Sequence, residues 1–572
     1  MSVNKKQVIK LLETIALYME LKGENPFKIS AFRKAAAALE TDDRSLSEIE
    51  DFTKIGGIGK GTAAVIIEYI EAGESSVLEE LEKEVPSTLI PLLKLPGLGG
   101  KKLAKLYKEL GVTDIASLQQ ACEEQRVQAL AGFGKKTEEK ILEAIAQFGT
   151  RPERLPIADV LPIASEIERR LSEILEVERF SRAGSLRRVR ETVKDLDFII
   201  ATNNPSAVRD ALLQFPRIEE VIASGDTKVS LRLQYEYEIS VDFRLVQPVE
   251  FITTLHHFTG SKDHNVKMRQ IAKAQNKKIS EYGVENLETG EIVTFESEED
   301  FFAHFGLPYI PPEVREDGRE IDWIEQYPNF IQLEDIKGDL HMHTTWSDGA
   351  FSIEEMVQAC IARGYQYMAI TDHSQYLKVA NGLTKERLLQ QGEEIEKLRA
   401  KYRDITILRG IEMDILPDAA LDFDDEVLAQ LDFVIGAIHS SFSQDRETIM
   451  KRLRAAIENN HVTMIAHPTG RLIGRREGYD VDTDMLIELA KETGTVLELN
   501  ANPNRLDLSA ELLKKAQDAG VKIAINTDAH TLDMLEHIEI GVAAARKGWI
   551  QRDTVLNAWE TDTLLAYIRR NK

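Results

Sequence analysis

Residues 184–201 read GSLRRVRETVKDLDFIIA and decide how the middle of the chain folds. Asp195 and Asp197 stand two residues apart at the start of an apolar run typical of a β-strand, so their side chains should share one face. Asp242 stands in a later strand-like run, ISVDFRLV at 239–246. Two carboxylates about 4 Å apart repel by roughly 4 kcal/mol at an effective dielectric of 20, so three together need protonation or divalent cations. The pattern predicts an α+β domain that binds Mg²⁺.

The residues just before these aspartates are suited to holding a triphosphate. Gly184 lets the backbone approach a ligand closely, the Ser185 hydroxyl can donate to a phosphate oxygen, and Arg188 can clamp the charge. Two cations held by carboxylates can orient an attacking oxygen and neutralise a leaving pyrophosphate. The segment therefore predicts nucleotidyl transfer.

These motifs resemble the nucleotidyltransferase superfamily and, more closely, the family X DNA polymerases related to polymerase beta. The resemblance extends over roughly residues 1–315 and includes HFTGS at 257–261 and LPYIPPEVRE at 307–316. It implies a palm with a thumb, in which Asp195, Asp197 and Asp242 are the catalytic Mg²⁺ ligands. The other contacts that it implies are nucleotide contacts from Gly184, Ser185, Arg188, His257, Phe258, Gly260 and Asn265, and a template contact from Arg269.

Three positions depart from the family pattern. Val193-Lys194 replaces the Ser-Gly that precedes the first aspartate in polymerase beta, and His257 stands where eukaryotic relatives have tyrosine. Val65 occupies the position of the Schiff-base lysine in relatives with deoxyribose-phosphate lyase activity, and valine cannot form an imine. We therefore expect this lyase activity to be absent.

The first 150 residues contain one phrase three times: KIGGIGK at 54–60, LPGLGGK at 95–101 and LAGFGKK at 130–136. Each copy is a glycine turn that opens a helical pattern, where backbone amides can face a phosphate. The set resembles helix-hairpin-helix binders of the DNA backbone. For the third copy, both a phosphate contact and a plain helix connector stay open. The expected contacts come from Gly57, Gly59, Lys60, Gly97, Gly99, Lys101 and Lys102.

After a linker-like stretch at 317–336, seven apolar strand-like runs alternate with amphipathic helical ones, which predicts a parallel α/β barrel. Imidazoles and carboxylates recur where these strands should end, and they suit Mn²⁺ or Zn²⁺. The number of candidates favours two or three ions, with Glu412 as the bridge. The candidates are His341, His343, Asp348, His373, Glu412, His439, His467, Asp528 and His530.

The motifs of this C-terminal block resemble the PHP (polymerase and histidinol phosphatase) phosphoesterases, whose fold is a distorted (β/α)7 barrel. The resemblance implies an active hydrolase with 3′-5′ exonuclease activity, and abasic-site endonuclease or 3′-phosphatase activity as further candidates. His461 and His537 lie outside the motifs, and we expect them to be structural.

Composition limits the alternatives. The chain has 572 residues, 43 % of them hydrophobic and 29 % charged, a net charge of −25 and two cysteines, Cys122 and Cys360. These values favour a folded multidomain protein without a disulfide framework. No apolar stretch is long enough for a membrane span, so we expect a cytoplasmic protein without membrane contact.

The pattern predicts six segments. They are two helix-hairpin-helix domains at 1–83 and 84–150, a palm at 151–249, a nucleotide-binding thumb at 250–316, the linker at 317–336 and the PHP domain at 337–572.

Together, these features predict a monomeric repair polymerase that fills short gaps, with gapped or primer-template DNA and dNTPs as partners. Two alternatives stay open. One is a small-molecule phosphatase whose nucleotidyltransferase half senses nucleotides, and the other is a non-catalytic DNA-binding scaffold.

Overall fold

The computed structural model describes residues 5–41, 46, 49–95, 98–147 and 153–569. The chain divides into two compact units, Met1–Pro152 and Glu153–Lys572. None of the helices in the described ranges has the length and apolar character needed to cross a bilayer. Both cysteines are buried as free thiols.

The described part of the N-terminal unit, Met1–Pro152, consists of helices joined by turns. One cluster of buried apolar side chains forms its core, with Leu12 and Ile15 of the first helix and Leu103 and Leu106 of the fifth fully buried. Ile58 and Leu98, the apolar residues inside the first two glycine turns, also belong to this core. The helices are α1 (Lys5–Lys22), α2 (Pro26–Thr41), α3 (Lys60–Ala72), α4 (Ser76–Glu84), α5 (Gly100–Leu110), α6 (Ile115–Glu123) and α7 (Lys135–Gln147).

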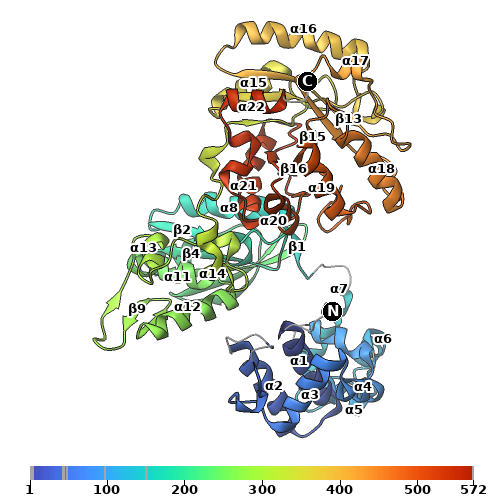
Figure 1. The fold of residues 1–572 in the computed structure, drawn as a ribbon. Helices are drawn as coiled ribbons and strands as arrows, with labels where there is room; N and C mark the ends of the chain where they lie inside the picture. The colour runs from blue at the N-terminus through green and yellow to red at the C-terminus, as the bar shows by residue number, and fades with distance from the viewer. Residues whose placement is uncertain (1–4, 42–45, 47–48, 96–97, 148–152, 570–572) are drawn as a thin grey trace. The chain divides into compact units, whose positions relative to one another are not determined.

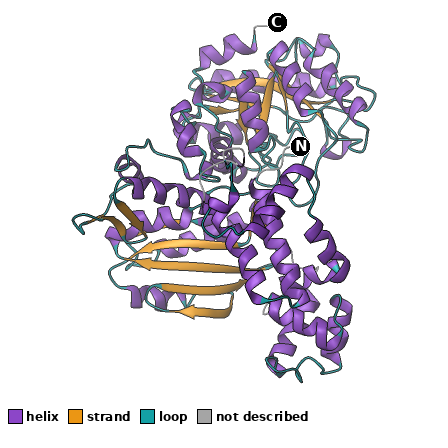
Figure 2. Ribbon diagram, turned by 60° about the horizontal axis from the view of Figure 1, so that its bottom comes forward, coloured by secondary structure: helices purple, strands orange, loops and turns teal. Residues whose placement is uncertain are grey.

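The C-terminal unit, Glu153–Lys572, begins with the palm, a five-stranded sheet in the order β2-β4-β7-β6-β5. Its central pair, β4 and β7, is parallel, and the other neighbours are antiparallel. Phe198 and Phe243 stack between these two strands with ring centroids 5.8 Å apart. Figure 2 shows this sheet with helices packed against it. The elements are α8 (Ile157–Ser172), β2 (Arg179–Arg182), α9 (Gly184–Arg187), β4 (Asp195–Ala201), α10 (Pro205–Leu212), β5 (Ile218–Ser224), β6 (Lys228–Gln234) and β7 (Glu238–Val246), with a small pair β1 (Leu155–Pro156) and β3 (Thr192–Val193).

The thumb follows the palm, and its Phe251, Phe301 and Phe302 are buried in an apolar core that also contains Ile199 and Ala201 of the palm. Its small sheet has the order β10-β9-β8. The elements are α11 (Phe251–Thr259), α12 (Lys262–Ala274), β8 (Lys277–Ser280), β9 (Gly283–Asn286), β10 (Ile292–Val293) and α13 (Glu298–Ala303).

The segment 317–336 contains α14 (Glu320–Trp323) and two short 3-10 turns, at Ile324–Gln326 and Leu333–Asp335. Ile321, Ile324 and Phe330 are buried in the thumb core together with Trp549, which comes from the far end of the chain. The segment is therefore packed on both of the parts that it joins.

The C-terminal barrel has seven strands whose order, β11 to β17, follows the chain, and all neighbouring pairs are parallel. A parallel bridge between Met342 and Ala529 joins the two ends, so the barrel is nearly closed. The strands are β11 (Gly338–Asp339), β12 (Tyr367–Ile370), β13 (Thr406–Asp414), β14 (Phe433–Ala437), β15 (Met464–Ile465), β16 (Val496–Asn500) and β17 (Ile523–Asn526). This confirms the predicted fold class.

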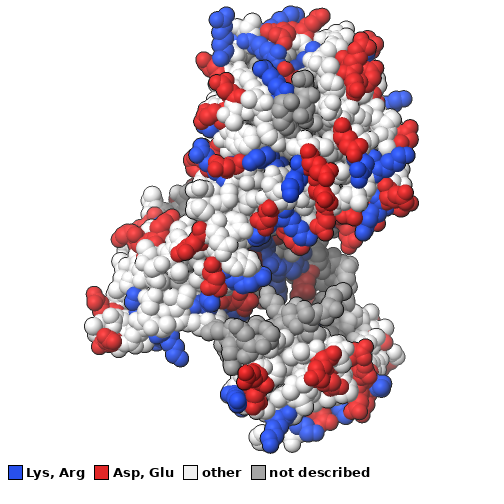
Figure 3. Space-filling view, in the orientation of Figure 1, with Lys and Arg blue, Asp and Glu red and all other residues white. Residues whose placement is uncertain are grey.

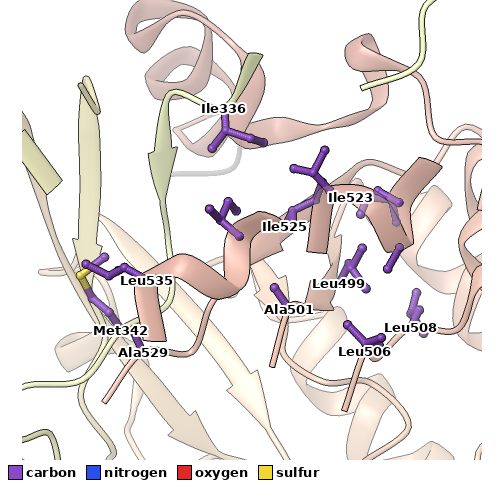
Figure 4. Packing of buried hydrophobic residues seen from close by; sticks show 14 of the residues in the cluster. Ile336, Met342, Leu499, Ala501, Leu506, Leu508, Ile523, Ile525, Ala529 and Leu535 are labelled. Carbon is purple, nitrogen blue, oxygen red and sulfur yellow. The ribbon is translucent and has the colours of Figure 1, made fainter. Parts of the chain in front are cut away.

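Helices cover the outside of the barrel, as Figure 1 shows for α16, α18 and α19. Figure 4 shows Leu499 close to Ile523 and Ile525 of the neighbouring strand, and Leu535 beside Met342 and Ala529. Figure 3 shows basic and acidic side chains interspersed over the face in view. The helices are α15 (Ile353–Ala362), α16 (Lys385–Lys401), α17 (Asp425–Leu428), α18 (Arg446–Ile457), α19 (Thr483–Thr493), α20 (Ala510–Ala519), α21 (His537–Lys547) and α22 (Thr561–Ile568).

Polar contacts join the barrel to the palm and the thumb. The Lys547 ammonium lies 2.7 Å from Glu316 Oε1 and donates to the Arg188 carbonyl at 2.9 Å. Arg471 donates to Glu191 Oε1 at 2.7 Å. These contacts make the second unit one compact body around two polar centres.

Candidate functional site

The first centre lies on the central parallel strands of the palm. In the register of β4 and β7, Asp197 is the direct partner of Asp242, while Asp195 lies two residues before Asp197 on β4. Burial raises the pKa of Asp197 to about 6, and the charges of Asp242 and Asp195 add to this shift. The three carboxylates therefore form the mutually repelling cluster expected from their spacing, which a divalent cation would relieve.

Two neighbours of Asp242 come from β6, the strand that pairs with β7. Ser230 Oγ donates to Asp242 Oδ1 at 2.6 Å, and the Lys228 ammonium lies 2.7 Å from Asp242 Oδ2. The sequence pattern gives no direct indication of either contact. Their spacing of two residues on β6, beside β7, is the only signal that could have suggested a shared face.

Gly184 lies against Asp197. Its φ is +58°, and a Cβ atom at this position would lie 2.2 Å from Asp197 Oδ2. Ser185 follows Gly184 in the short helix α9. Any side chain at 184 would thus intrude on a carboxylate of the cluster.

Arg188 is held by the protein. Its guanidinium donates to the Thr259 carbonyl, and its Nε lies 3.5 Å from Glu316 Oε1. Gly260, the residue after Thr259, has a φ of +67°, and a Cβ there would lie 3.3 Å from Arg188 Nη1. The structure thus brings Arg188 and the HFTGS turn together.

The remaining nucleotide candidates surround this turn. Asn265 Nδ2 donates to the His257 carbonyl at 2.7 Å, and Asn265 Oδ1 is buried without a hydrogen-bond partner among the described residues. The Arg244 guanidinium lies 4.5 Å from the centre of the Phe258 ring. Burial lowers the pKa of His257. Arg269 is exposed on α12.

In the N-terminal unit, the glycine turns have the expected geometry where they are described. Gly57 has a φ of +107° and Gly132 a φ of +90°, and Gly59 and Gly99 are the N-cap residues of α3 and α5. A Cβ at Gly59 or Gly99 would meet no atom within 4 Å, so each turn presents open space in front of a helix N-terminus. Gly97 lies outside the described residues.

The lysines near these turns differ in exposure. Lys60 and Lys101 are exposed, whereas Lys102 is half-buried with its ammonium 5.6 Å from the centre of the Phe133 ring. Phe133 lies in the third turn, so Lys102 bridges two of the repeats. Lys60 and Lys101 are therefore more accessible to a phosphate than Lys102 is.

The second centre lies where the barrel strands end. Eight of its nine predicted ligands fall into one connected cluster, because three groups of mutually close ligand atoms share His343, His373 and Glu412 between them. His467 adjoins the cluster with Nε2 at 3.0 Å from Glu412 Oε1. The groups are His343, Asp348, His373 and His530; His341, His343, Glu412 and Asp528; and His373, Glu412 and His439.

Glu412 occupies the middle of this cluster. Its Oε2 lies 2.9 Å from His373 Nδ1 and 3.4 Å from His341 Nε2, and its Oε1 lies 3.1 Å from His439 Nε2. Despite its burial, the pKa of Glu412 is well below its usual range because these imidazoles favour its charge.

The donor set fits metal ions. The Nδ1 atoms of His343 and His467 are buried without a hydrogen-bond partner among the described residues, and His373 Nδ1 faces the Glu412 carboxylate. Buried polar atoms normally have partners. Unpaired imidazole nitrogens around a shared carboxylate are donors that suit Mn²⁺ or Zn²⁺.

Second-layer carboxylates orient the imidazoles. Glu498 Oε1 lies 2.7 Å from His341 Nδ1, and Asp414 Oδ1 lies 3.2 Å from His439 Nδ1. The sequence analysis missed both residues, although each lies at or near the carboxyl end of a barrel strand. His461 and His537 are in none of the clusters found among the described residues.

Comparison with known proteins assigns families to most of the chain. Residues 3–75 match the helix-hairpin-helix domain, and residues 89–147 match a SAM-like helix-hairpin-helix tandem. Residues 254–316 match the DNA polymerase beta thumb, and residues 339–502 match the PHP domain.

The curated relatives differ in how much of the chain they match. The DNA polymerase/3′-5′ exonuclease PolX of Bacillus subtilis (strain 168) is 65 % identical over 569 residues, which cover 100 % of both chains. A probable phosphatase of Thermoanaerobacter sp. (strain X514) is 28 % identical over 248 residues, which cover 41 % of this chain and 95 % of the relative.

Proposed function

This chain belongs to the PolX family of DNA polymerase/3′-5′ exonucleases, and we propose that its two polar centres divide these activities between them. It is a DNA polymerase with a 3′-5′ exonuclease, its helix-hairpin-helix domains bind DNA, and its activities depend on metal ions. The palm carboxylates would serve nucleotide addition, and the barrel cluster would serve hydrolysis.

The observation that carries the palm assignment is the pairing of Asp197 with Asp242, with Asp195 on the same strand. Mg²⁺ bound there would activate the primer 3′-hydroxyl and neutralise the leaving pyrophosphate. Next to this site, the Ser185 hydroxyl would donate a hydrogen bond to the triphosphate of the incoming nucleotide. Gly184 keeps the space beside Asp197 free.

Contacts to the sugar and base would come from the HFTGS turn and α12. His257, Phe258, Gly260 and Asn265 would surround the incoming dNTP, and Arg188, held against this turn by Thr259, would face its phosphates. The exposed Arg269 would reach the template strand.

In the barrel, the nine-residue cluster would hold two or three Mn²⁺ or Zn²⁺ ions with Glu412 as the bridge. Ions of this kind supply an activated water and polarise the scissile phosphodiester. Glu498 and Asp414 would fix the orientation of His341 and His439. Abasic-site endonuclease and 3′-phosphatase chemistry would use the same residues.

The proposed substrates are gapped or primer-template DNA and dNTPs, and the enzyme would work as a monomer in DNA repair in the cytoplasm, where these substrates occur. The glycine turns would grip the DNA backbone through the amides after Gly57, Gly59, Gly97 and Gly99 and through Lys60, Lys101 and Lys102. Val65 is buried in α3. Because valine has no amine, Val65 supports the absence of a deoxyribose-phosphate lyase that acts through a Schiff base.

The two alternatives account for less of the chain. The probable phosphatase of Thermoanaerobacter matches 41 % of the chain, and a small-molecule phosphatase has no need of a palm with three clustered carboxylates. A scaffold has no need of a complete ligand cluster.

A gap-filling assay tests the proposal. Single-nucleotide gapped DNA incubated with dNTPs and either Mg²⁺ or Mn²⁺ should show extension of the primer, and degradation from its 3′ end should appear when dNTPs are omitted. Absence of extension with both metals would refute the palm assignment.

A further inference from the structure

The loop Gln375–Gly382, which we call the rim loop, leaves the barrel beside the hydrolytic centre. It is closed at its base, where Leu383 N donates to the His373 carbonyl at 2.7 Å and Ser374 N donates to the Glu412 carbonyl at 3.1 Å. Both acceptors belong to residues of the proposed metal cluster. The base of the loop is therefore tied to the backbone of the cluster.

Further contacts hold the rim loop in place. Tyr376 N donates to Asp422 Oδ2 at 2.8 Å, and Asn381 Nδ2 donates to the Trp346 carbonyl at 3.3 Å. Trp346 precedes Asp348, another candidate ligand, by two residues. The loop is thus anchored on two neighbouring loops of the barrel rim.

The anchored loop nevertheless exposes apolar side chains. Val379 is 93 % exposed and Tyr376 is 41 % exposed. The Tyr376 hydroxyl has no hydrogen-bond partner in the described part of the chain. Exposed apolar residues are ordinary when they stand singly, and these two stand together on one anchored loop beside the hydrolytic centre.

Chain position and a backbone hydrogen bond place Tyr376 on the rim of the hydrolytic centre. Tyr376 follows His373 by three residues, and Asp422, which accepts the Tyr376 N–H, lies on the loop after β13, the strand that carries Glu412. Tyr376 therefore lies between loops that follow two strands bearing proposed ligands.

We propose that Tyr376 is a stacking platform for the nucleobase of the 3′-terminal nucleotide, with Val379 as a flanking apolar contact. An unpaired terminal base exposes a π-face that any aromatic ring can cover, without reading its identity. The inference rests on the proposed assignment of exonuclease activity to the barrel cluster.

Tyr376 takes no part in the chemistry. In the hydrolysis itself, a water oxygen adds to phosphorus, the bond from phosphorus to the 3′-oxygen of the penultimate nucleotide breaks, and that oxygen receives a proton. The terminal nucleotide leaves as its 5′-monophosphate. The stacked base would keep the scissile phosphate over the cluster during this step.

The test compares two single-stranded oligonucleotides that differ only at the 3′ end, one with an ordinary terminal nucleotide and one with a tetrahydrofuran residue that lacks the base. Tyr376→Ala should raise KM for the ordinary substrate about 5- to 150-fold, the range expected for one lost base stack. It should leave KM for the base-free substrate unchanged. Tyr376→Phe should behave as the wild type on both.

Two controls separate this proposal from the function on which it rests. Tyr282→Ala removes another exposed tyrosine, 56 % exposed in the thumb, and should change neither KM. Primer extension should be normal in all variants, which shows that they are folded. An unchanged KM in Tyr376→Ala, or equal losses on both substrates, would overturn the proposal. Degradation that survives loss of His341 and His343 would instead refute the assignment of the exonuclease to the cluster.

Discussion

Asp197 on β4 and Asp242 on β7 are register partners on adjacent parallel strands. Their proximity, added to burial, raises the pKa of Asp197 to about 6. Carboxylates placed in this way repel one another, and a divalent cation bound between them would relieve this repulsion.

Gly184→Ala should damage this site selectively. The new Cβ would lie 2.2 Å from Asp197 Oδ2, at a backbone φ of +58°. Displacing a catalytic group by about 1 Å can cost about 100-fold in rate, so we expect single-nucleotide gap filling to slow by about that factor. Exonuclease activity should be unchanged. Gly225→Ala, whose Cβ would meet only Lys228 O at 3.6 Å, is the matched control. Normal gap filling by Gly184→Ala would contradict this role for the glycine.

Gly59→Val and Gly99→Val should weaken DNA binding without unfolding the N-terminal unit, because the added side chains meet no protein atom within 4 Å of Cβ. Each lost amide-phosphate hydrogen bond should cost about 1 kcal/mol, or about fivefold in Kd. The loss should be similar for unrelated sequences, since phosphate contacts carry no base information. Fluorescence anisotropy with gapped DNA measures it.

The control for these variants is Gly61→Ala, at the second residue of α3, where an added Cβ also meets no atom within 4 Å. It should bind DNA as the wild type does. If the valine variants also bound normally at moderate salt, the turns would be mere connectors.

Glu498→Gln should impair hydrolysis, because the amide can no longer hold His341 through a charged hydrogen bond at 2.7 Å. Loss of such an orienting partner typically costs about 10- to 100-fold in metal affinity or activity. A Mn²⁺ titration of 3′ degradation should show the loss, and primer extension should not change. An unaltered Mn²⁺ requirement would mean that Glu498 is a packing residue.

Acid should affect the two centres at different pH values. A metal must displace the proton of any protonated ligand, so its apparent affinity falls as pH drops below the pKa of that ligand. Glu412 and Asp414 raise the pKa of His439 to about 10 despite its burial, whereas the pKa of Asp197 is about 6. Between about pH 8.5 and about pH 6.5, the Mn²⁺ needed for half-maximal hydrolysis should therefore rise more than that for polymerisation.

The metal preferences of the two activities should differ as well. Imidazole ligands favour Mn²⁺ or Zn²⁺, while an all-carboxylate site accepts Mg²⁺ readily. Primer extension and 3′ degradation should each be measured over this pH range, once with Mg²⁺ and once with Mn²⁺. If the two activities had the same pH profile and the same metal preference, imidazole ligation would not distinguish the centres.

Sequence patterns predicted the elements that carry the chemistry because their physical signals are strong. The apolar run after Asp197 is typical of a buried strand, and histidines that recur at the ends of several buried strands are typical of a metal centre. Strand β5 was not predicted, since it lies at the edge of the sheet. Its residues are nearly all exposed, so buried and exposed positions do not alternate along it. Glu498 and Asp414 were missed because only the folded barrel turns them toward His341 and His439.

The segment 317–336 shows another limit of sequence patterns. It was interpreted as a linker because its apolar residues have no period, yet Ile321, Ile324 and Phe330 are buried. Their partners include Trp549, more than 200 residues later in the chain. Contacts between such distant residues leave no local pattern.

The central claim is that two separate centres perform the two activities. It is tested most directly by measuring primer extension and 3′ degradation on the same gapped DNA for Asp197→Ala and for His341→Ala/His343→Ala. Asp197→Ala should lose extension and keep degradation, and the double variant should do the reverse. Full extension by Asp197→Ala, or an equal fall of both activities in either folded variant, would contradict the claim.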